Sequence, residues 1–278
     1  MDPNEIPPLI NPPEPGPEPK VSRWRWWIHL AVLTAFPLLV GALSLRRMDT
    51  LRAPILPANV RGLLTVSFFE LVFFGALFAL AWVASRVNAK QLLLKWRGGG
   101  SPLLWGLAYS IALRVGIAVV VIIVVGLWFG ITGAQVSEAM HSQPRLDRMI
   151  NADAMTGHPL YLILLLTLVS FVVAGLREEL WRAGMLAGIS ALFPRGFSTL
   201  GGRAVAVLAV AVVFGLGHTA QGWSGVVVTG LLGAGLGGIM LRHRSIWEAV
   251  LAHGFFDAST FLFLYLLAKL SPQYLPHG

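Results

Sequence analysis

The chain has 278 residues, of which 56% are hydrophobic and only 12% are charged, with a formal net charge of +8. A soluble domain averages about 25% charged residues, and several apolar runs here exceed the ~18 residues that indicate a membrane helix. The composition therefore excludes an ordinary soluble protein and predicts an all-α fold, a polytopic transmembrane helical bundle. Cysteine is absent, which excludes disulfides, zinc–thiolate sites and cysteine nucleophiles.

Residues 1–22 are rich in proline and too polar for a signal peptide, so we expect a disordered N-terminal tail. The basic residues lie mainly in short loops between apolar runs, a distribution typical of contact with anionic lipid rather than nucleic acid. We therefore expect the membrane lipid bilayer as a partner and no nucleic acid. Basic residues are more numerous in the loops on the side of the N-terminus, which favours a cytoplasmic N-terminus. The tryptophans near residue 25 and the lack of cysteine favour a bacterial plasma membrane.

Seven apolar segments follow in chain order, at about 27–45, 60–84, 103–131, 159–192, 204–219, 223–241 and 246–269. A membrane helix needs about 20 residues, so the segment 159–192 is too long for one ordinary span. It must tilt, project beyond the bilayer, or break near Gly184 or Gly188, and the prediction is seven or eight helices. We divide the chain into N-terminal transmembrane helices with their loops, residues 23–158, and a C-terminal transmembrane region, residues 159–270. The longest loop is predicted at 132–158.

Some unusual residues have a simple structural interpretation. Glu70 and Arg114 are isolated in apolar segments, and we expect each to make a structural pair between helices. Glu248 follows a tryptophan near a segment start and is predicted to be interfacial. The run 230–238 contains a formal dinucleotide-binding pattern but lacks the preceding strand that such a site needs. Close helix packing explains its glycines better; they are Gly233, Gly235 and Gly238.

The late apolar segments contain ionisable residues that are costly in a membrane, by at least ~2.5–3.5 kcal/mol for a charge at the bilayer centre. They are Glu178, Glu179, Arg182, His218, His253 and Asp257. Spacings of four residues place Glu178 with Arg182, Phe214 with His218, and His253 with Asp257 on common helix faces. We expect three helices to direct these polar faces into one cavity. Carboxylates, imidazoles and a guanidinium are the groups needed to activate water and stabilise an oxyanion.

On these motifs the chain resembles the CAAX protease and bacteriocin-processing family of intramembrane proteases, which includes the type II CAAX prenyl endopeptidase. The family pattern is EExxxR, then FxxxH, then HxxxN or HxxxD on successive helices. Phe214 and His218 match the second motif, and His253 and Asp257 match the third. The resemblance covers about residues 159–270. It implies a hydrolase, a CAAX-type intramembrane endopeptidase that cleaves membrane-associated or CAAX-like substrates through Glu-activated water.

The first motif departs from the family pattern, because only two residues separate Glu179 from Arg182. Alignment on Arg182 places Arg177 and Glu178 at the paired glutamates. The general base is therefore either Glu178 or Glu179. An ion pair between Glu178 and Arg182, four residues apart, favours Glu179 as the base.

The resemblance implies either a metal-free glutamate protease or a metalloprotease. Zn²⁺ would be held by His218, His253 and Glu179, but HExxH does not occur, and we expect no cofactor because glutamate and histidine suffice for the chemistry. Membrane-embedded acids also mark proton-coupled transporters, which are disfavoured because the chain shows no internal repeat. A non-catalytic membrane scaffold or immunity protein is a further alternative.

Overall fold

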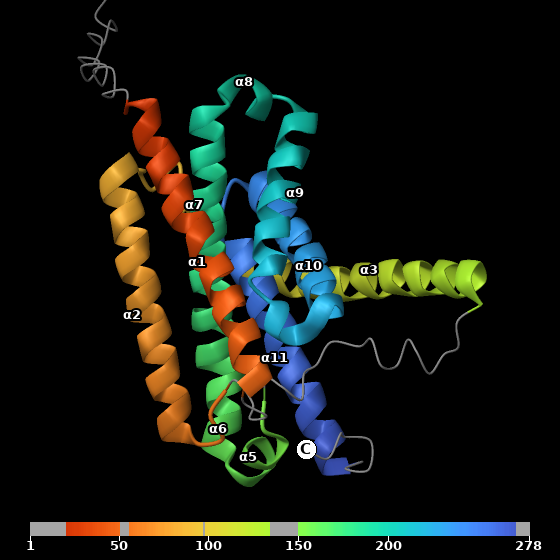
Figure 1. Cartoon of the computed structure of the whole chain (residues 1–278). Coiled ribbons are helices and arrows are strands. Elements are labelled where there is room, and N and C mark those ends of the chain that lie inside the picture. Colours follow the sequence, from red (N-terminus) through yellow and green to blue (C-terminus); the bar gives the residue numbers. More distant parts are fainter. Residues whose placement is uncertain (1–20, 51–55, 97, 134–149, 271–278) are drawn as a thin grey trace, which may run out of the picture.

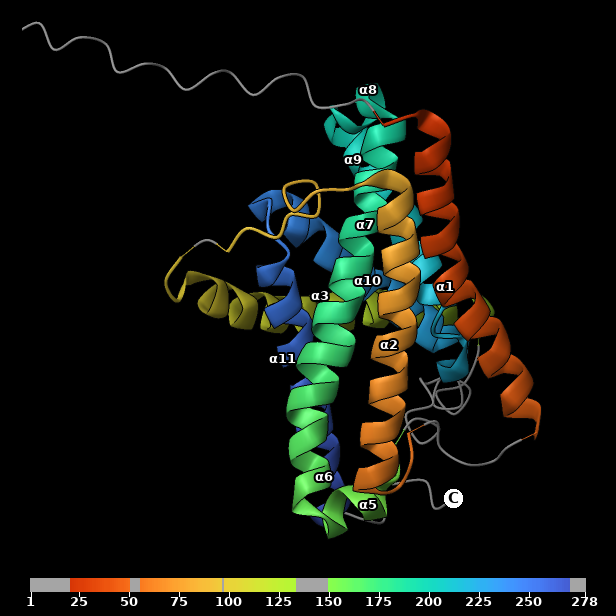
Figure 2. The same ribbon diagram turned by 90° about the vertical axis from the view of Figure 1, so that its left-hand side faces the viewer.

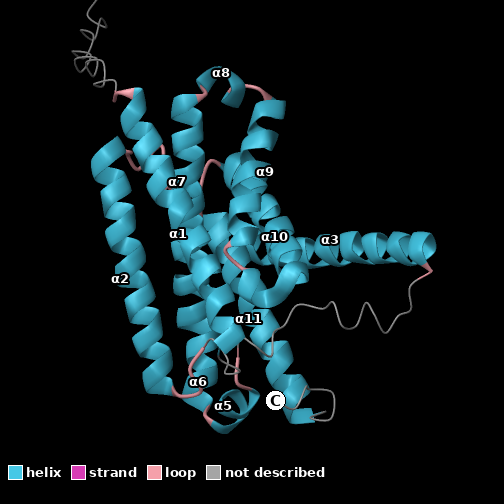
Figure 3. Cartoon of the chain, viewed as in Figure 1, coloured by secondary structure: helices cyan, strands magenta, loops and turns pink. Residues whose placement is uncertain are grey.

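A computed structural model describes residues 21–50, 56–96, 98–133 and 150–270 of the chain (Figure 1). The predicted tail, up to residue 20, and most of the predicted loop 132–158 lie outside these ranges. Within them every regular element is a helix, which confirms the predicted all-α class (Figure 3). The helices are α1 (Arg23–Thr50), α2 (Val60–Ser85), α3 (Ser101–Thr132), α5 (Ala152–Gly157), α6 (Pro159–Leu164), the π-helical η2 (Leu165–Leu176), α7 (Arg177–Leu192), α8 (Pro194–Phe197), α9 (Leu200–Leu216), the 3₁₀ turn η3 (Thr219–Gln221), α10 (Gly222–His243) and α11 (Trp247–Leu270).

Each of the seven predicted apolar segments coincides with a helix. Among the described residues, six helical stretches are long and apolar enough to cross a membrane, and α9 is apolar but has only 17 residues. The chain is therefore a polytopic helical membrane protein.

The segment 159–192 is one unbroken helical stretch formed by α6, η2 and α7, so a break at Gly184 or Gly188 does not occur. Both glycines instead allow α1 to approach α7 closely. A Cβ atom at Gly184 would lie 2.7 Å from Leu33, and one at Gly188 would lie 2.6 Å from Leu30. His29 of α1 reinforces this contact, with Nε2 at 2.9 Å from the carbonyl oxygen of Gly184.

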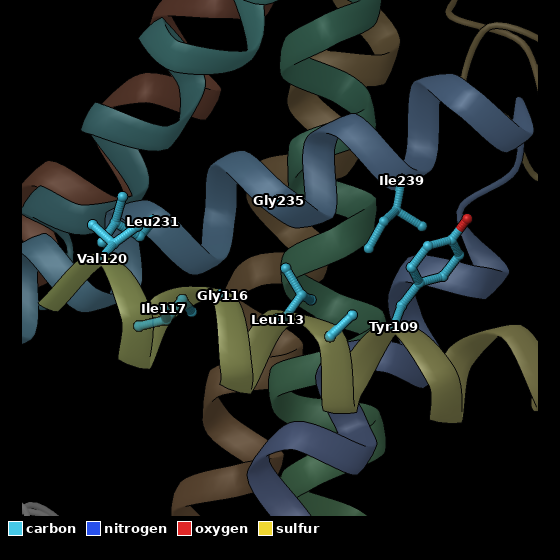
Figure 4. Close-up of a pocket in the computed structure, with 9 residues that line it drawn as sticks. Tyr109, Leu113, Gly116, Ile117, Val120, Leu231, Gly235 and Ile239 are labelled. Carbon is cyan, nitrogen blue, oxygen red and sulfur yellow. The ribbon is translucent and has the colours of Figure 1, made fainter. Parts of the chain in front are cut away.

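The helices α1, α2 and α7 run side by side, α9 and α10 contact α7 from the other side, and α11 packs along η2 (Figures 1 and 2). The helix α3 runs across the bundle, contacts α11 and α10, and projects away from the other helices at its C-terminal end (Figure 1). An apolar groove of about 330 Å³ lies between α3 and α10, with Leu113 and Tyr109 on one side and Gly235 and Ile239 on the other (Figure 4).

The predicted packing role of the glycine run in α10 holds for two of its members. A Cβ at Gly233 would lie 2.8 Å from the ring of Phe214, and one at Gly235 would lie 2.2 Å from Leu113. Gly238 has no such contact, since nothing lies within 4 Å of its Cβ position. Close approach explains Gly233 and Gly235 because any side chain there would separate the helices.

Two isolated charges of the sequence have different surroundings. Arg114 of α3 donates hydrogen bonds to the carbonyl oxygen of Phe256 at 2.7 Å and to the hydroxyls of Ser259 and Thr260, which confirms its structural role. Glu248 is fully buried within the protein and lies 3.6 Å from Nδ1 of His243, where the start of α11 meets the end of α10. Its position at the membrane interface stays a prediction.

Candidate active site

The polar residues of the three motifs come from three parts of the fold. Glu178, Glu179 and Arg182 lie in the first two turns of α7, directly after the π-helical η2. His218 lies between α9 and η3, and His253 with Asp257 lies on α11. π-helical segments are rare in proteins overall, but those that occur often lie at functional sites. Here η2 and α11 pack along each other, which brings the start of α7 beside His253.

Glu179 is the buried centre of this site. Its carboxylate forms an ion pair with Arg182, and its Oε1 lies 3.0 Å from Nδ1 of His253. Glu179 and Arg182 are both buried, and the Arg182 guanidinium lies over the ring of Phe214 at 4.5 Å. The carboxylate and guanidinium thus compensate each other where water is excluded, and uncompensated charges there would be costly.

The predicted ion pair between Glu178 and Arg182 was wrong, because Arg182 pairs with Glu179. Residues three and four apart both lie near one another on a helix, so spacing alone did not distinguish the two partners. Glu178 is instead held by Arg177, whose Nη2 donates to Oε1 at 2.6 Å.

Glu178 occupies the more open side of the site, with a side chain that is 13% exposed whereas that of Glu179 is 0% exposed. Its Oε2 lies 3.8 Å from Nε2 of His253. The ring of Phe214 contacts both imidazoles, with its centroid 4.6 Å from that of His218 and 6.3 Å from that of His253. Glu178 is thus the carboxylate that lies beside His253 and remains within reach of water.

Arg177 and Glu70 extend the site onto α2, which the sequence analysis missed. Arg177 donates from Nε to the carbonyl oxygen of Val173 at 2.8 Å, and its Nη1 lies 3.3 Å from Oε2 of Glu70. Glu70 was expected to make a structural pair, and it does so with a residue that also binds Glu178. The unusual run of charges from Arg177 to Arg182 was the only sequence signal for this link.

Each histidine is oriented by a fixed partner. Nδ1 of His218 donates to the carbonyl oxygen of Phe214 at 2.8 Å, so this nitrogen carries the proton. The rings of Phe214 and His218 lie 4.6 Å apart. Nε2 of His253 lies between Glu178 and Asp257, and Oδ2 of Asp257 is 3.7 Å from it. The expected convergence of the three polar faces is therefore present, and it joins α7, α9 and α11.

The residues predicted for zinc do not form a metal site. Oε1 of Glu179 already faces both Arg182 and Nδ1 of His253, so a cation there would meet the guanidinium. Within the described ranges, no group of three or more histidine, aspartate and glutamate side chains is arranged to hold a metal ion. The donor set does not fit Zn²⁺, and we derive no step through a metal.

The late helices are similar to a known protein family. Residues 160–259 match a family model described as type II CAAX prenyl endopeptidase, Rce1-like. The matched region contains all three motifs and every residue of the predicted site. No curated protein and no solved structure matches the chain. The match confirms the resemblance on which the sequence analysis relied.

Proposed function

We propose that the chain hydrolyses peptide bonds of membrane-anchored substrates through water activated by Glu178, because residues 160–259 match the family model of the type II CAAX prenyl endopeptidases. The match supports a CAAX-type intramembrane endopeptidase in general. The observation that carries the finer proposal is the position of Glu178, a partly exposed carboxylate beside His253. This position favours Glu178 over Glu179 as the general base.

The reaction follows from these positions. Glu178 takes a proton from water, and the resulting hydroxide forms a bond to the carbonyl carbon of the peptide. Nδ1 of His218 and of His253 already donates to Phe214 or Glu179, so the two imidazoles, each carrying a second proton on Nε2, donate hydrogen bonds from Nε2 to the oxyanion of the tetrahedral intermediate. The carbon–nitrogen bond then breaks, and Glu178 returns its proton to the leaving amine. The balance needs only water and the substrate.

The remaining residues position these groups. Glu179 holds Nδ1 of His253 and so orients its ring, and Arg182 holds Glu179. Asp257 lies beside Nε2 of the same ring. Phe214 orients the ring of His218 by accepting a hydrogen bond from Nδ1 through its backbone carbonyl. Positioning of this kind matters because a displacement of about 1 Å can cost on the order of 10²-fold in rate.

We further propose that hydrolysis needs no cofactor, because the carboxylate and the imidazoles are chemically sufficient. A chelation experiment tests this part of the proposal separately. Cleavage by enzyme treated with a strong chelator should equal that of untreated enzyme. Activity that is lost on chelation and restored by Zn²⁺ would overturn it.

The surroundings follow from the same proposal. Six apolar helices within the described ranges make the chain an integral membrane protein, and its substrates are accordingly proteins or peptides that reach the site within the bilayer. We propose that the protein lies in a bacterial plasma membrane with its N-terminus in the cytoplasm, because of the charges of its loops and its composition.

The test is a cleavage assay on the full chain purified in detergent. Transmembrane and CAAX-type peptides are offered to the wild type, to His218→Ala, and to Arg195→Gln as a control at an exposed position far from the site. We expect product from the wild type and the control, and a loss of at least about 10²-fold in His218→Ala. Equal cleavage by His218→Ala would contradict the proposal. Proton uptake into liposomes without cleavage would favour a transporter, and peptide binding without cleavage would favour a scaffold.

A further inference from the structure

A second cavity, of about 350 Å³, lies where the ends of α7, α8, α9 and α10 meet. Two arginines, two serines and several apolar side chains line this cavity, among them Arg203, Arg244, Ser190, Ser198, Leu93 and Leu241. Ser190 is twelve residues beyond Glu178 on α7, which corresponds to about 18 Å along a helix. The cavity is therefore separate from the proposed active site.

The charge of this cavity is unbalanced. Its lining contains Arg203 and Arg244 and no acidic residue. Arg203 is fixed from the α8 side, since its Nε donates to the carbonyl oxygen of Phe197 at 2.9 Å and its Nη2 donates to that of Ser198 at 3.2 Å. The side chain of Arg244 makes no hydrogen bond or ion pair within the described part of the chain. Both arginines are exposed to solvent, so an anion from outside can reach the two guanidiniums.

The backbone of the cavity is unusual as well. Leu93 and Arg244 have φ angles of 56° and 50°, in the left-handed region that glycine or asparagine adopts more easily. Arg244 caps the C-terminal end of α10 in this conformation. A helix cap alone would favour glycine, so the arginine at this position points to a use of its side chain.

We propose that this cavity binds an anionic phosphate group between Arg203 and Arg244. Guanidiniums offer paired donors that match phosphate oxygens. The two guanidiniums are the donors here, because the hydroxyls of Ser190 and Ser198 already donate to the carbonyl oxygens of Ala187 and Arg195. The phosphate belongs either to a phospholipid headgroup or to a soluble phosphate. The apolar lining and the basic residues at the ends of membrane helices favour a phospholipid headgroup, because basic pockets between such helices bind anionic lipids.

The binding site would act on the same helices that carry the active site. The helix α7 carries Arg182, α9 carries Phe214, and α10 carries Gly233 beside that ring. A ligand held between the ends of these helices binds only the folded chain and therefore stabilises it. The proposal does not depend on proteolysis, and its test is a binding measurement.

The experiment measures the thermal unfolding of the full chain in detergent. One arm adds phosphatidylglycerol, one adds phosphatidylcholine and one adds inorganic phosphate, all at the same ionic strength. For the wild type we expect a rise of the unfolding temperature on the order of 5 °C with phosphatidylglycerol or with inorganic phosphate, and a smaller change with phosphatidylcholine. A rise with phosphatidylglycerol alone identifies a lipid headgroup, and a rise with inorganic phosphate identifies a soluble source.

Three variants connect the effect to the cavity. Arg244→Asn removes the cation and keeps a residue that tolerates the left-handed conformation, so it should fold and lose the rise. Arg244→Lys keeps a cation and should retain part of it, and Arg195→Gln, an exposed charge on α8 that does not line the cavity, should retain all of it. The proposal is overturned if Arg244→Asn retains the full rise, if phosphatidylcholine acts as strongly as phosphatidylglycerol, or if neither anionic probe stabilises the wild type.

Discussion

Glu179 on α7 and His253 on α11 are joined by a contact of 3.0 Å between Oε1 and Nδ1, at a point where both side chains are buried. The contact fixes which way the imidazole points, because the opposite nitrogen must then face Glu178 and Asp257. It also shows that the two adjacent glutamates have different surroundings. Glu179 belongs to the buried framework with Arg182, and Glu178 faces the reacting space.

Replacement of Arg182 should lower the free energy of unfolding of the protein. Arg182→Gln leaves the Glu179 carboxylate buried without its cation, and breaking a buried pair in this way costs about 3–5 kcal/mol. We expect a clearly lower unfolding temperature in detergent for this variant. Arg195→Gln, which removes an exposed arginine, should unfold within error of the wild type. Equal stability of Arg182→Gln and the wild type would mean that the buried pair is not formed.

Removal of Arg177 should slow cleavage without unfolding the chain. Arg177 holds Oε1 of Glu178 at 2.6 Å, so Arg177→Gln frees the proposed base to rotate. A fall in kcat of about tenfold to 10²-fold is expected, with little change in KM, because the loss is one of orientation. Glu70→Gln, which touches only the far side of the guanidinium, should have a smaller effect. An unchanged kcat in Arg177→Gln would remove Arg177 from the site.

The close approach of α1 to α7 is tested by a matched pair of substitutions. Alanine at Gly188 would place its Cβ 2.6 Å from Leu30, whereas alanine at Gly75 of α2 would meet nothing within 4 Å. We expect Gly188→Ala to lose about 1–3 kcal/mol of stability through overpacking. Gly75→Ala should be neutral or slightly stabilising, since alanine is the better helix former. Thermal unfolding of the two variants side by side gives the answer, and equal effects would contradict the observed packing.

Much of the fold could be predicted because it depends on local composition. Hydropathy located seven helical segments, and the three motifs located the polar residues that converge between α7, α9 and α11. Spacing on single helices was enough to bring His253 and Asp257 to one face.

What the sequence did not reveal depends on contacts between distant segments. The contact of Glu70 with Arg177 joins residues 107 positions apart, and no periodicity reports such a contact. Arg182 had two glutamates in reach, and only the position of His253 on α11 decides between them. Gly184 suggested a helix break, but its neighbour Leu33 on α1 makes it a packing position. In each case the deciding partner lies on another helix.

The central claim is that Glu178 acts as the base and Glu179 as a buried structural residue. The most direct test compares Glu178→Gln with Glu179→Gln in one cleavage assay, with thermal unfolding measured on the same samples. We expect Glu178→Gln to keep its unfolding temperature and to lose cleavage by about 10²–10⁴-fold, as for removal of a general base. Glu179→Gln should lower the unfolding temperature because it leaves Arg182 buried without a countercharge. Cleavage by Glu178→Gln at the wild-type rate would contradict the account.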